Sequence, residues 1–385
     1  MRPPAARMAD IQPFHVMALL QRARVLEAEG RRIVHMEIGE PDYPSPKEVV
    51  RAGIAALEAG KTHYTPALGL AELRRAIASS YPLAARPHPD HVVVTPGASG
   101  ALQLIMAVLL NPGDEVLMAD PGYPCNRHFV RLFEGQAKAV PVGPATAYQL
   151  NAELIRQHWT PKTTAIMVAS PSNPTGTVIA NGELKKIIAT VAELGGVLIV
   201  DEIYHGIVYD TELTSALTYS KDIFVINSFS KYYGMTGWRV GWLVSPPDYV
   251  AAIDKLAQNI FLATSTPAQY AALATFGPGV EAELQDRVGV FHQRRDYLLS
   301  ALIELGFKIP VIPQGAFYLY ADCSDLTDDS FGLATALLEQ AGVAITPGLD
   351  FGDHRASQHV RFSYTTSIDE LKEGLGRIEK FLNYG

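Results

Sequence analysis

The sequence has little cysteine, no long apolar run and no basic stretch, and each absence excludes a class of protein. Its 385 residues include only two cysteines, Cys125 and Cys323, which form neither a disulfide framework nor a metal-binding spacing. We therefore expect no metal site and a reducing compartment, the cytoplasm. The longest apolar stretch, residues 101–110, is too short to cross a bilayer. The N-terminus also lacks the apolar core of a signal peptide, so no membrane partner is expected.

Acidic residues outnumber basic residues by 40 to 32, which gives a formal net charge of −8. No run of lysine and arginine interleaved with aromatic residues is present, so we expect no binding to nucleic acid. The small-residue stretch 95–102 also fails to match two familiar enzyme motifs. It does not read G-x-G-x-x-G, and Ala101 stands where the G-x-S-x-G motif of hydrolases requires glycine.

What the sequence does contain is an alternation of short apolar runs with helical patterns. Residues 181–194 repeat apolar side chains at helical spacing, whereas five runs read as buried strands: 114–120, 163–170, 195–202, 222–230 and 240–245. Continuous apolar strands that alternate with helices predict an α/β fold with a mostly parallel sheet. Polar stretches follow three of these strands, and ligands of such sheets bind beyond the carboxyl ends of the strands. The sequence therefore predicts one crevice lined by several loops.

The last third of the chain has a different pattern. Residues 281–306 read as one long helix that ends at Gly306, and short strands follow at 315–322, 343–346 and 359–364 before a closing helix. A chain of this length also exceeds one simple core. We therefore predict a large domain over residues 47–280 and a smaller α+β domain built from residues 1–46 and 281–385.

One lysine in the crevice needs an explanation, because lysine is seldom placed in an apolar stretch. Lys231 lies between Ser228 and Arg239, and a hydroxyl and a guanidinium can together bind a phosphate. A desolvated lysine near other cations loses its proton more readily and becomes a nucleophile toward an aldehyde. These residues predict a Schiff base between Lys231 and a phosphorylated aldehyde cofactor.

Three neighbouring features suit the same cofactor. Asp201 ends a buried strand, so its carboxylate needs a cationic partner, such as a protonated ring nitrogen, or several donors. Asn173 is held between two prolines in the loop 170–176, and Gly176 permits an unusual backbone angle there. The stretch 95–102 opens an apolar helix whose N-terminal amides can bind an anion.

Taken together, the ordered motifs resemble those of fold-type I pyridoxal-phosphate enzymes, specifically the class I and II aminotransferases of the aspartate aminotransferase superfamily. The resemblance covers nearly the whole chain, from IGEPD (38–42) and YTPALGLAELR (64–74), through SPSNPTG (170–176), DEIY (201–204) and SFSK with GWRVG (228–241), to GAFY (315–318) and VRFSY (360–364). It implies a seven-stranded, mostly parallel sheet flanked by helices, pyridoxal 5'-phosphate as the cofactor, and a homodimer with its active sites at the subunit interface.

The resemblance also implies roles for individual residues around the cofactor ring. Lys231, Asp201 and Tyr204 form the catalytic set: Lys231 makes the Schiff base and later moves a proton, and Asp201 keeps the ring nitrogen protonated. Asn173 and Tyr204 contact the ring hydroxyl, and Tyr123 stacks on the ring.

At the other end of the cofactor, Ala98, Ser99, Ser228 and Arg239 form the implied phosphate site, and Tyr64 reaches the phosphate of the neighbouring subunit.

For the substrate, the resemblance assigns the α-carboxylate to Arg361, with Gly39 and Asn173 beside it. It also implies a cis peptide bond between Asn173 and Pro174. No motif selects a cation for a second, distal carboxylate, for which the candidates are Arg7, Arg22, Lys61 and Arg127. The aromatic residues Phe14, Tyr64, Tyr123 and Phe317 equally suit an apolar or aromatic side chain.

The expected reaction is transfer of an amino group from an L-amino acid to a 2-oxo acid. The expected acceptor is 2-oxoglutarate. The expected mechanism is ping-pong and passes through aldimine and ketimine forms at Lys231. A C–S β-lyase on the same fold is the main alternative. Two further alternatives are a serine acyl-transferase, since Ser228 to Lys231 matches S-x-x-K but no S-D-N or K-T-G element occurs, and a non-catalytic ligand-binding regulator.

Overall fold

The computed structural model describes residues 2–13 and 15–384. Its centre is a seven-stranded sheet with the strand order β2-β8-β7-β6-β5-β3-β4, in which β8 runs antiparallel to both neighbours and the other pairs are parallel. The strands are β2 (Val92–Thr95), β3 (Glu115–Asp120), β4 (Gln136–Pro141), β5 (Thr163–Ala169), β6 (Val197–Asp201), β7 (Phe224–Ser228) and β8 (Gly241–Val244). The predicted α/β class with a mostly parallel sheet is confirmed.

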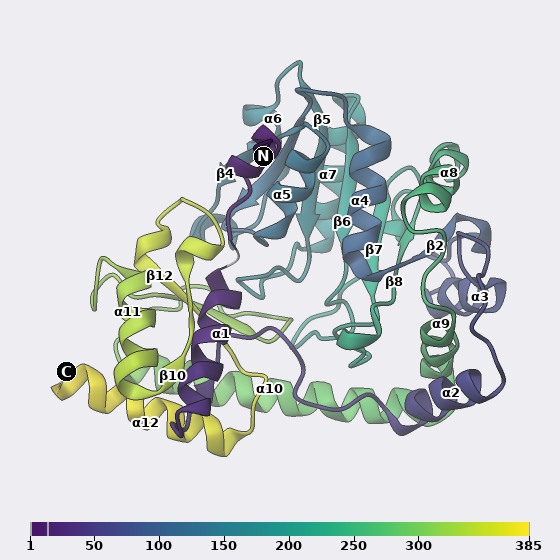
Figure 1. Ribbon diagram of the computed structural model, residues 1–385. Helices are drawn as coiled ribbons and strands as arrows, with labels where there is room; N and C mark the ends of the chain where they lie inside the picture. The colour runs from purple at the N-terminus through teal and green to yellow at the C-terminus, as the bar shows by residue number, and fades with distance from the viewer. Residues whose placement is uncertain (1, 14, 385) are drawn as a thin grey trace.

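Helices cover both faces of this sheet because successive strand residues point to opposite sides. Val92 and Val94 of β2 belong to an apolar cluster with α3 and α7, whereas Val93 belongs to a second cluster with α4 and α8. Figure 1 shows α4 and α5 in front of the sheet. The helices of this part are α2 (Lys47–Glu58), α3 (Ala71–Ser80), α4 (Gly97–Leu109), α5 (Cys125–Leu132), α6 (Ala152–His158), α7 (Asn181–Glu193), α8 (Val250–Ile260) and α9 (Thr266–Leu273).

The C-terminal part has its own small sheets and its own apolar cluster. A three-stranded antiparallel sheet has the order β11-β12-β9, and β1 pairs in parallel with β10. Elements from both ends of the chain form this part: α1 (His15–Ala28) and β1 (Val34–His35) from the N-terminal end, followed by α10 (Val280–Glu304), β9 (Tyr318–Asp322), α11 (Ser330–Ala336), β10 (Val343–Ala344), β11 (Thr346–Pro347), β12 (His359–Ser363) and α12 (Ile368–Tyr384). In Figure 1, α10 runs along the base of the molecule, and α1 lies beside the C-terminal elements.

Three strands, β1, β2 and β4, are not among those predicted from the sequence. The single strand expected at 343–346 is two short strands, β10 and β11, separated by Ile345. The long helix was placed within two residues of α10. The expected domain boundaries fall where α2 and α10 begin, and the division into two domains remains a prediction. No helix in the described ranges combines the length and apolar character needed to cross a membrane.

Candidate active site

Eleven of the twelve predicted site residues line one cavity of about 420 Å³. The cavity lies beyond the carboxyl ends of the parallel strands, as expected for an open α/β sheet. The residues come from the ends of β6 and β7, from the loops after β1, β3 and β5, from the start of α4 and from β12. They are Gly39, Ala98, Ser99, Tyr123, Asn173, Asp201, Tyr204, Ser228, Lys231, Arg239 and Arg361.

Lys231 follows β7, and its amine faces the loop after β1. Its Nζ donates a hydrogen bond of 2.6 Å to the carbonyl oxygen of Gly39. Burial is the main cause that lowers the pKa of Lys231 to about 8; the charges of Arg361 and Arg239 act in the same direction, and those of Glu40 and Asp201 oppose it. A much larger share of the amine is therefore neutral near pH 7 than in an exposed lysine, as nucleophilic and basic chemistry requires.

Asp201 ends β6 and is 8% exposed. Its Oδ1 accepts a hydrogen bond of 3.0 Å from the backbone N–H of Ile203. Burial is the main cause that raises the pKa of this carboxyl to about 6; the N–H of Ile203 and the charge of Lys231 oppose the rise, and the charge of Glu202 adds to it. A cation bound beside Asp201 would stabilise its charged form.

Arg361 lies on β12 and is 3% exposed. Its Nη1 donates to Oδ1 of Asn173 at 2.9 Å, and its Nη2 donates to the carbonyl oxygen of Glu37 and to Oγ1 of Thr346. The Nε atom is buried without a hydrogen-bond partner among the described residues. A buried donor of this kind is costly unless a ligand satisfies it, so the guanidinium has capacity left for a carboxylate.

Two aromatic rings fix the plane of that guanidinium. The central carbon of Arg361 lies 4.3 Å from the ring centre of Tyr318 and 4.8 Å from that of Phe351. The expected cis peptide bond between Asn173 and Pro174 is present, and Asn173 places its amide oxygen against Arg361. The arginine is thus held in one orientation before any substrate binds.

Another group of lining residues suits a phosphate ester. Ser228 and Arg239 line it together with the first turn of α4, whose N–H groups have no partner inside the helix. The helix can come this close because two glycines allow it. A Cβ on Gly97 would lie 2.5 Å from Nη2 of Arg239, and one on Gly241 would lie 2.7 Å from the backbone of Gly97. The guanidinium and the helix N-terminus form a donor set for a dianion. The hydroxyl of Ser228 joins this set by turning away from Ser230 and the carbonyl oxygen of Val240, its present partners.

Tyr318 is a site residue that the sequence reasoning missed. Its hydroxyl lies 2.8 Å from the hydroxyl of Tyr204, and a Cβ on Gly39 would lie 2.0 Å from the same oxygen. Burial raises the pKa of Tyr318 and holds that of Tyr204 well above its ordinary value, so both hydroxyls stay protonated. Tyr318 stands in the quoted motif GAFY, which is the signal that could have identified it.

The sequence-based candidates for a distal carboxylate do not line the cavity. Arg22 is engaged with Glu339 through contacts of 2.5 and 2.9 Å, and Arg7 binds the carbonyl oxygen of Leu132. Lys61 and Arg127 also lie outside it. The arginine that does line the cavity, besides Arg239 and Arg361, is Arg24 of α1.

Two of the aromatic candidates are placed elsewhere. The predicted cofactor ligand Tyr64 is 82% exposed and is absent from the cavity lining. Phe317 is fully buried, with its ring centre 6.0 Å from Nζ of Lys231. Phe14 lies outside the described residues.

A larger hollow, of about 760 Å³, lies elsewhere on the molecule. It is lined by Glu202, His205 and Tyr232, among others, and by none of the twelve predicted residues. Cavity size alone would therefore have pointed away from the cluster of lysine, aspartate and arginine described above.

Comparison with known proteins agrees with the motifs. The sequence pattern of the family "Aminotransferase class I and II" matches residues 31–378. The chain is 38% identical over 382 residues to a (5-formylfuran-3-yl)methyl phosphate transaminase of Methanocaldococcus jannaschii, covering 98% of this chain and 99% of that protein. It is also 38% identical over 384 residues to a valine–pyruvate aminotransferase of Mycobacterium tuberculosis, covering 98% of each.

A solved structure shows the same fold. The crystal structure of an aminotransferase from Mycobacterium tuberculosis matches with a TM-score of 0.96 and 37% sequence identity, and the match covers 100% of both chains. Pattern, relatives and fold thus agree over nearly the full length. The chain belongs to the class I and II aminotransferases, a family of pyridoxal-phosphate-dependent enzymes.

Proposed function

We propose that this enzyme moves the amino group of an L-amino acid to a 2-oxo acid in two half-reactions at Lys231, with 2-oxoglutarate as the acceptor. The observation that carries the proposal is the meeting of a lysine of lowered pKa, a buried aspartate and a buried arginine in one cavity. Each of the three supplies a different requirement of the reaction.

The phosphate end and the ring end of the site both suit pyridoxal phosphate. Ser228, Arg239 and the first turn of α4 would hold its phosphate, and Asp201 would face its ring nitrogen. The bound cofactor supplies an aldehyde for an amine and a protonated ring that accepts electrons from the substrate Cα. Tyr123 and Asn173 complete the proposed ring contacts from the loops after β3 and β5.

Lys231 is the proposed proton carrier. Its Nζ must be neutral to take the proton from the substrate Cα, and general-base catalysis is most effective when the pKa lies near the working pH. The pKa of about 8, which results from burial, supports this role. The hydrogen bond from Nζ to the carbonyl oxygen of Gly39 fixes the direction of the amine within the cavity.

Arg361 is the proposed anchor for the α-carboxylate. Its guanidinium is held by Asn173 and by the two flanking rings, and its Nε is buried without a partner among the described residues. Anchoring the carboxylate there fixes the Cα–H bond relative to Lys231, and such orientation contributes strongly to rate. Every α-amino acid carries this carboxylate, so Arg361 does not select the side chain.

The relatives' names do not select a donor either. One is named for a furan methyl phosphate and one for valine and pyruvate. They support amino transfer with different side chains on one scaffold. The choice of 2-oxoglutarate stands as a proposal and is tested by comparing acceptors after the first half-reaction.

The test is covalent trapping of the cofactor on the lysine. Wild-type protein incubated with pyridoxal phosphate and reduced with borohydride should carry one phosphopyridoxyl group on the peptide that contains Lys231, since the Schiff base forms with loss of water and is reduced to a secondary amine. Lys231→Ala should lose both this label and turnover, whereas Lys221→Ala, at a lysine outside the cavity, should retain both.

Normal turnover by Lys231→Ala would overturn the assignment. Release of pyruvate and ammonia without an added oxo acid would instead identify a β-lyase, because elimination needs no acceptor.

A further inference from the structure

One wall of the active-site cavity is formed by α1, which the sequence motifs did not include. Val16, Met17 and Leu20 line the cavity from this helix. Residues three and four apart lie on the same face of a helix, so these side chains form one continuous apolar stripe. Val16 and Leu20 are 4% and 7% exposed, whereas Met17 is 53% exposed. Val16 and Leu20 are thus the packed residues of the stripe, and Met17 is its accessible edge.

A buried carboxylate places this stripe beside the substrate anchor. Asp350, which is 1% exposed, accepts hydrogen bonds from the backbone N–H groups of His15 at 2.9 Å and Val16 at 3.1 Å. An anion at a helix N-terminus is favourable, so Asp350 fixes the first turn of α1. The next residue, Phe351, packs its ring against Arg361. The first turn of α1 is therefore tied to the segment that touches the proposed carboxylate anchor.

One cation on the same helix has no task in the proposed site. Among the described lining residues, Lys231, Arg239 and Arg361 already have proposed tasks, and Arg24 is the remaining cation. Arg24 stands eight residues after Val16, about 12 Å along the helix axis. No hydrogen bond or ion pair connects it with another described residue. Val16 and Met17 belong to the turn that Asp350 ties to the segment beside Arg361, whereas Arg24 lies farther along α1.

We propose that Val16, Met17 and Leu20 form the side-chain subsite of this enzyme, and that its amino donors are monocarboxylic amino acids with apolar side chains, such as leucine and methionine. This inference rests on the proposed amino transfer at Lys231 and adds the donor class. Contact with the stripe removes apolar substrate surface from water, and one methylene more or less in such a pocket changes specificity by roughly 10-fold to 200-fold.

The first experiment measures kcat/KM of the holoenzyme for leucine and aspartate, in the wild type and in Met17→Lys. The wild type should favour leucine. Met17→Lys puts a cation on the accessible edge and should raise the aspartate-to-leucine ratio at least tenfold. Val25→Lys is the matched control, because Val25 is on the same helix, is 42% exposed and does not line the cavity. Its ratio should equal that of the wild type.

A second experiment measures binding without turnover. Holoenzyme is titrated with 4-methylpentanoate and with succinate, which has the carbon skeleton of aspartate, and the wild type should bind the apolar acid more tightly. Val16→Thr should weaken 4-methylpentanoate about tenfold, whereas Val25→Thr should not. This titration reports on the subsite even when no amino acid is turned over, so its result is separate from a failure of the proposed reaction.

Two results would overturn the inference. One is a wild-type preference for aspartate or succinate that Arg24→Gln abolishes, which would make Arg24 the residue that binds the distal carboxylate of an amino donor. The other is an equal change of the aspartate-to-leucine ratio in Met17→Lys and Val25→Lys, which would show that the stripe does not contact the side chain.

Discussion

At the scale of single residues, Asp201 is held in a state that costs the protein stability. Its carboxyl has a pKa of about 6 because it is buried, whereas the ordinary value is 3.8. The folded protein therefore binds this proton more tightly than the unfolded chain. The resulting stabilisation is present at low pH and is lost as the pH rises through 6. Above that pH the fold carries a buried charge whose proposed partner is the cofactor ring.

This predicts that Asp201→Asn stabilises the protein without cofactor at neutral pH. Between pH 4 and pH 7.5, the wild type should lose about 2 to 3 kcal/mol of unfolding free energy relative to the variant, since each pKa unit corresponds to about 1.4 kcal/mol. Urea unfolding of both cofactor-free proteins across this range measures the difference. Curves that stay parallel over the whole range would show that Asp201 titrates normally.

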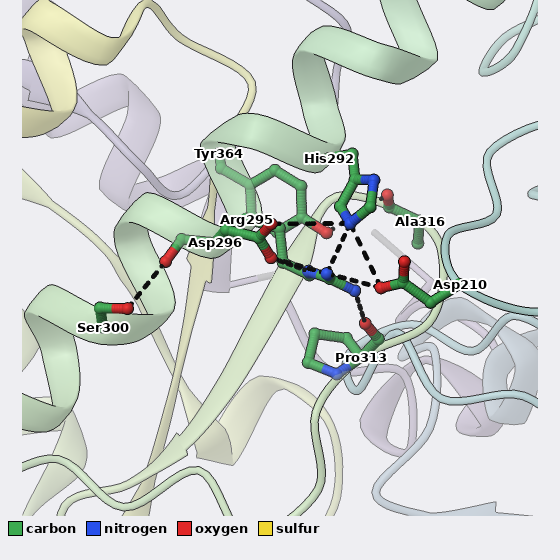
Figure 2. A network of polar contacts seen from close by, with 8 residues as sticks. All are labelled: Asp210, His292, Arg295, Asp296, Ser300, Pro313, Ala316 and Tyr364. Atoms are coloured by element: carbon green, nitrogen blue, oxygen red, sulfur yellow. Dashed lines mark hydrogen bonds and ion pairs between the residues drawn. The ribbon is translucent and has the colours of Figure 1, made fainter.

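At the scale of elements, a polar network joins the loop after β6 to α10 and to the segment before β9. Arg295 of α10 is 4% exposed and donates to Asp210 at 2.8 Å, to Asp296 at 2.6 Å and to the carbonyl oxygen of Pro313 at 3.0 Å. Figure 2 shows these groups converging around the guanidinium. The joined segments lead directly to Tyr204 and Tyr318, whose hydroxyls meet in the active site.

Arg295→Met should therefore lower the free energy of unfolding by about 2 kcal/mol, because hydrogen bonds to a charged group contribute roughly 1.5 to 3 kcal/mol. Asp296→Asn is the control: this carboxylate is largely exposed, and exposed pairs contribute at most about 1 kcal/mol. Chemical denaturation measures both. Equal losses in the two variants would mean that the arginine stabilises the protein only through its surface ion pair.

Some strands of the sheet could be predicted from the sequence and others could not. Strands β5, β6 and β7 were predictable because they are buried on both faces and read as continuous apolar runs. β4 was missed because this edge strand is mostly exposed and keeps no apolar run. The antiparallel direction of β8 was not predictable, since a fully buried strand has the same pattern in either direction.

The residues of the candidate site were also only partly predictable from the sequence. Residues within the quoted motifs, such as Lys231 and Arg361, can be identified from the sequence alone. The stripe on α1 was not, because its first turn is fixed by Asp350, more than 300 residues away along the chain. Only the folded arrangement brings that carboxylate to the helix.

At the scale of the whole molecule, Tyr64 and α2 suggest how two copies would associate. Val50, Ile54 and Leu57 are 39%, 51% and 57% exposed and recur at helical spacing on α2. An exposed apolar stripe of this kind is typical of a protein interface. Tyr64 follows α2, is 82% exposed and does not reach the cavity of its own chain. A homodimer that covers the α2 stripe would bring Tyr64 toward the phosphate site of the second copy.

Mixed dimers test this arrangement directly. Tyr64→Ala should weaken cofactor binding, and Lys231→Ala should abolish activity. If Tyr64 acts across the interface, a hybrid of the two variants contains one site with an intact Lys231 and an intact Tyr64 from the other chain. Mixing the subunits under exchange conditions should then restore tight pyridoxal phosphate binding and activity in that site. Tyr384→Ala, which removes an equally exposed tyrosine, should leave cofactor affinity unchanged. A hybrid with no gain over the Tyr64→Ala dimer, or a fully active monomer, would contradict the role of Tyr64, because each site would then depend on one chain alone.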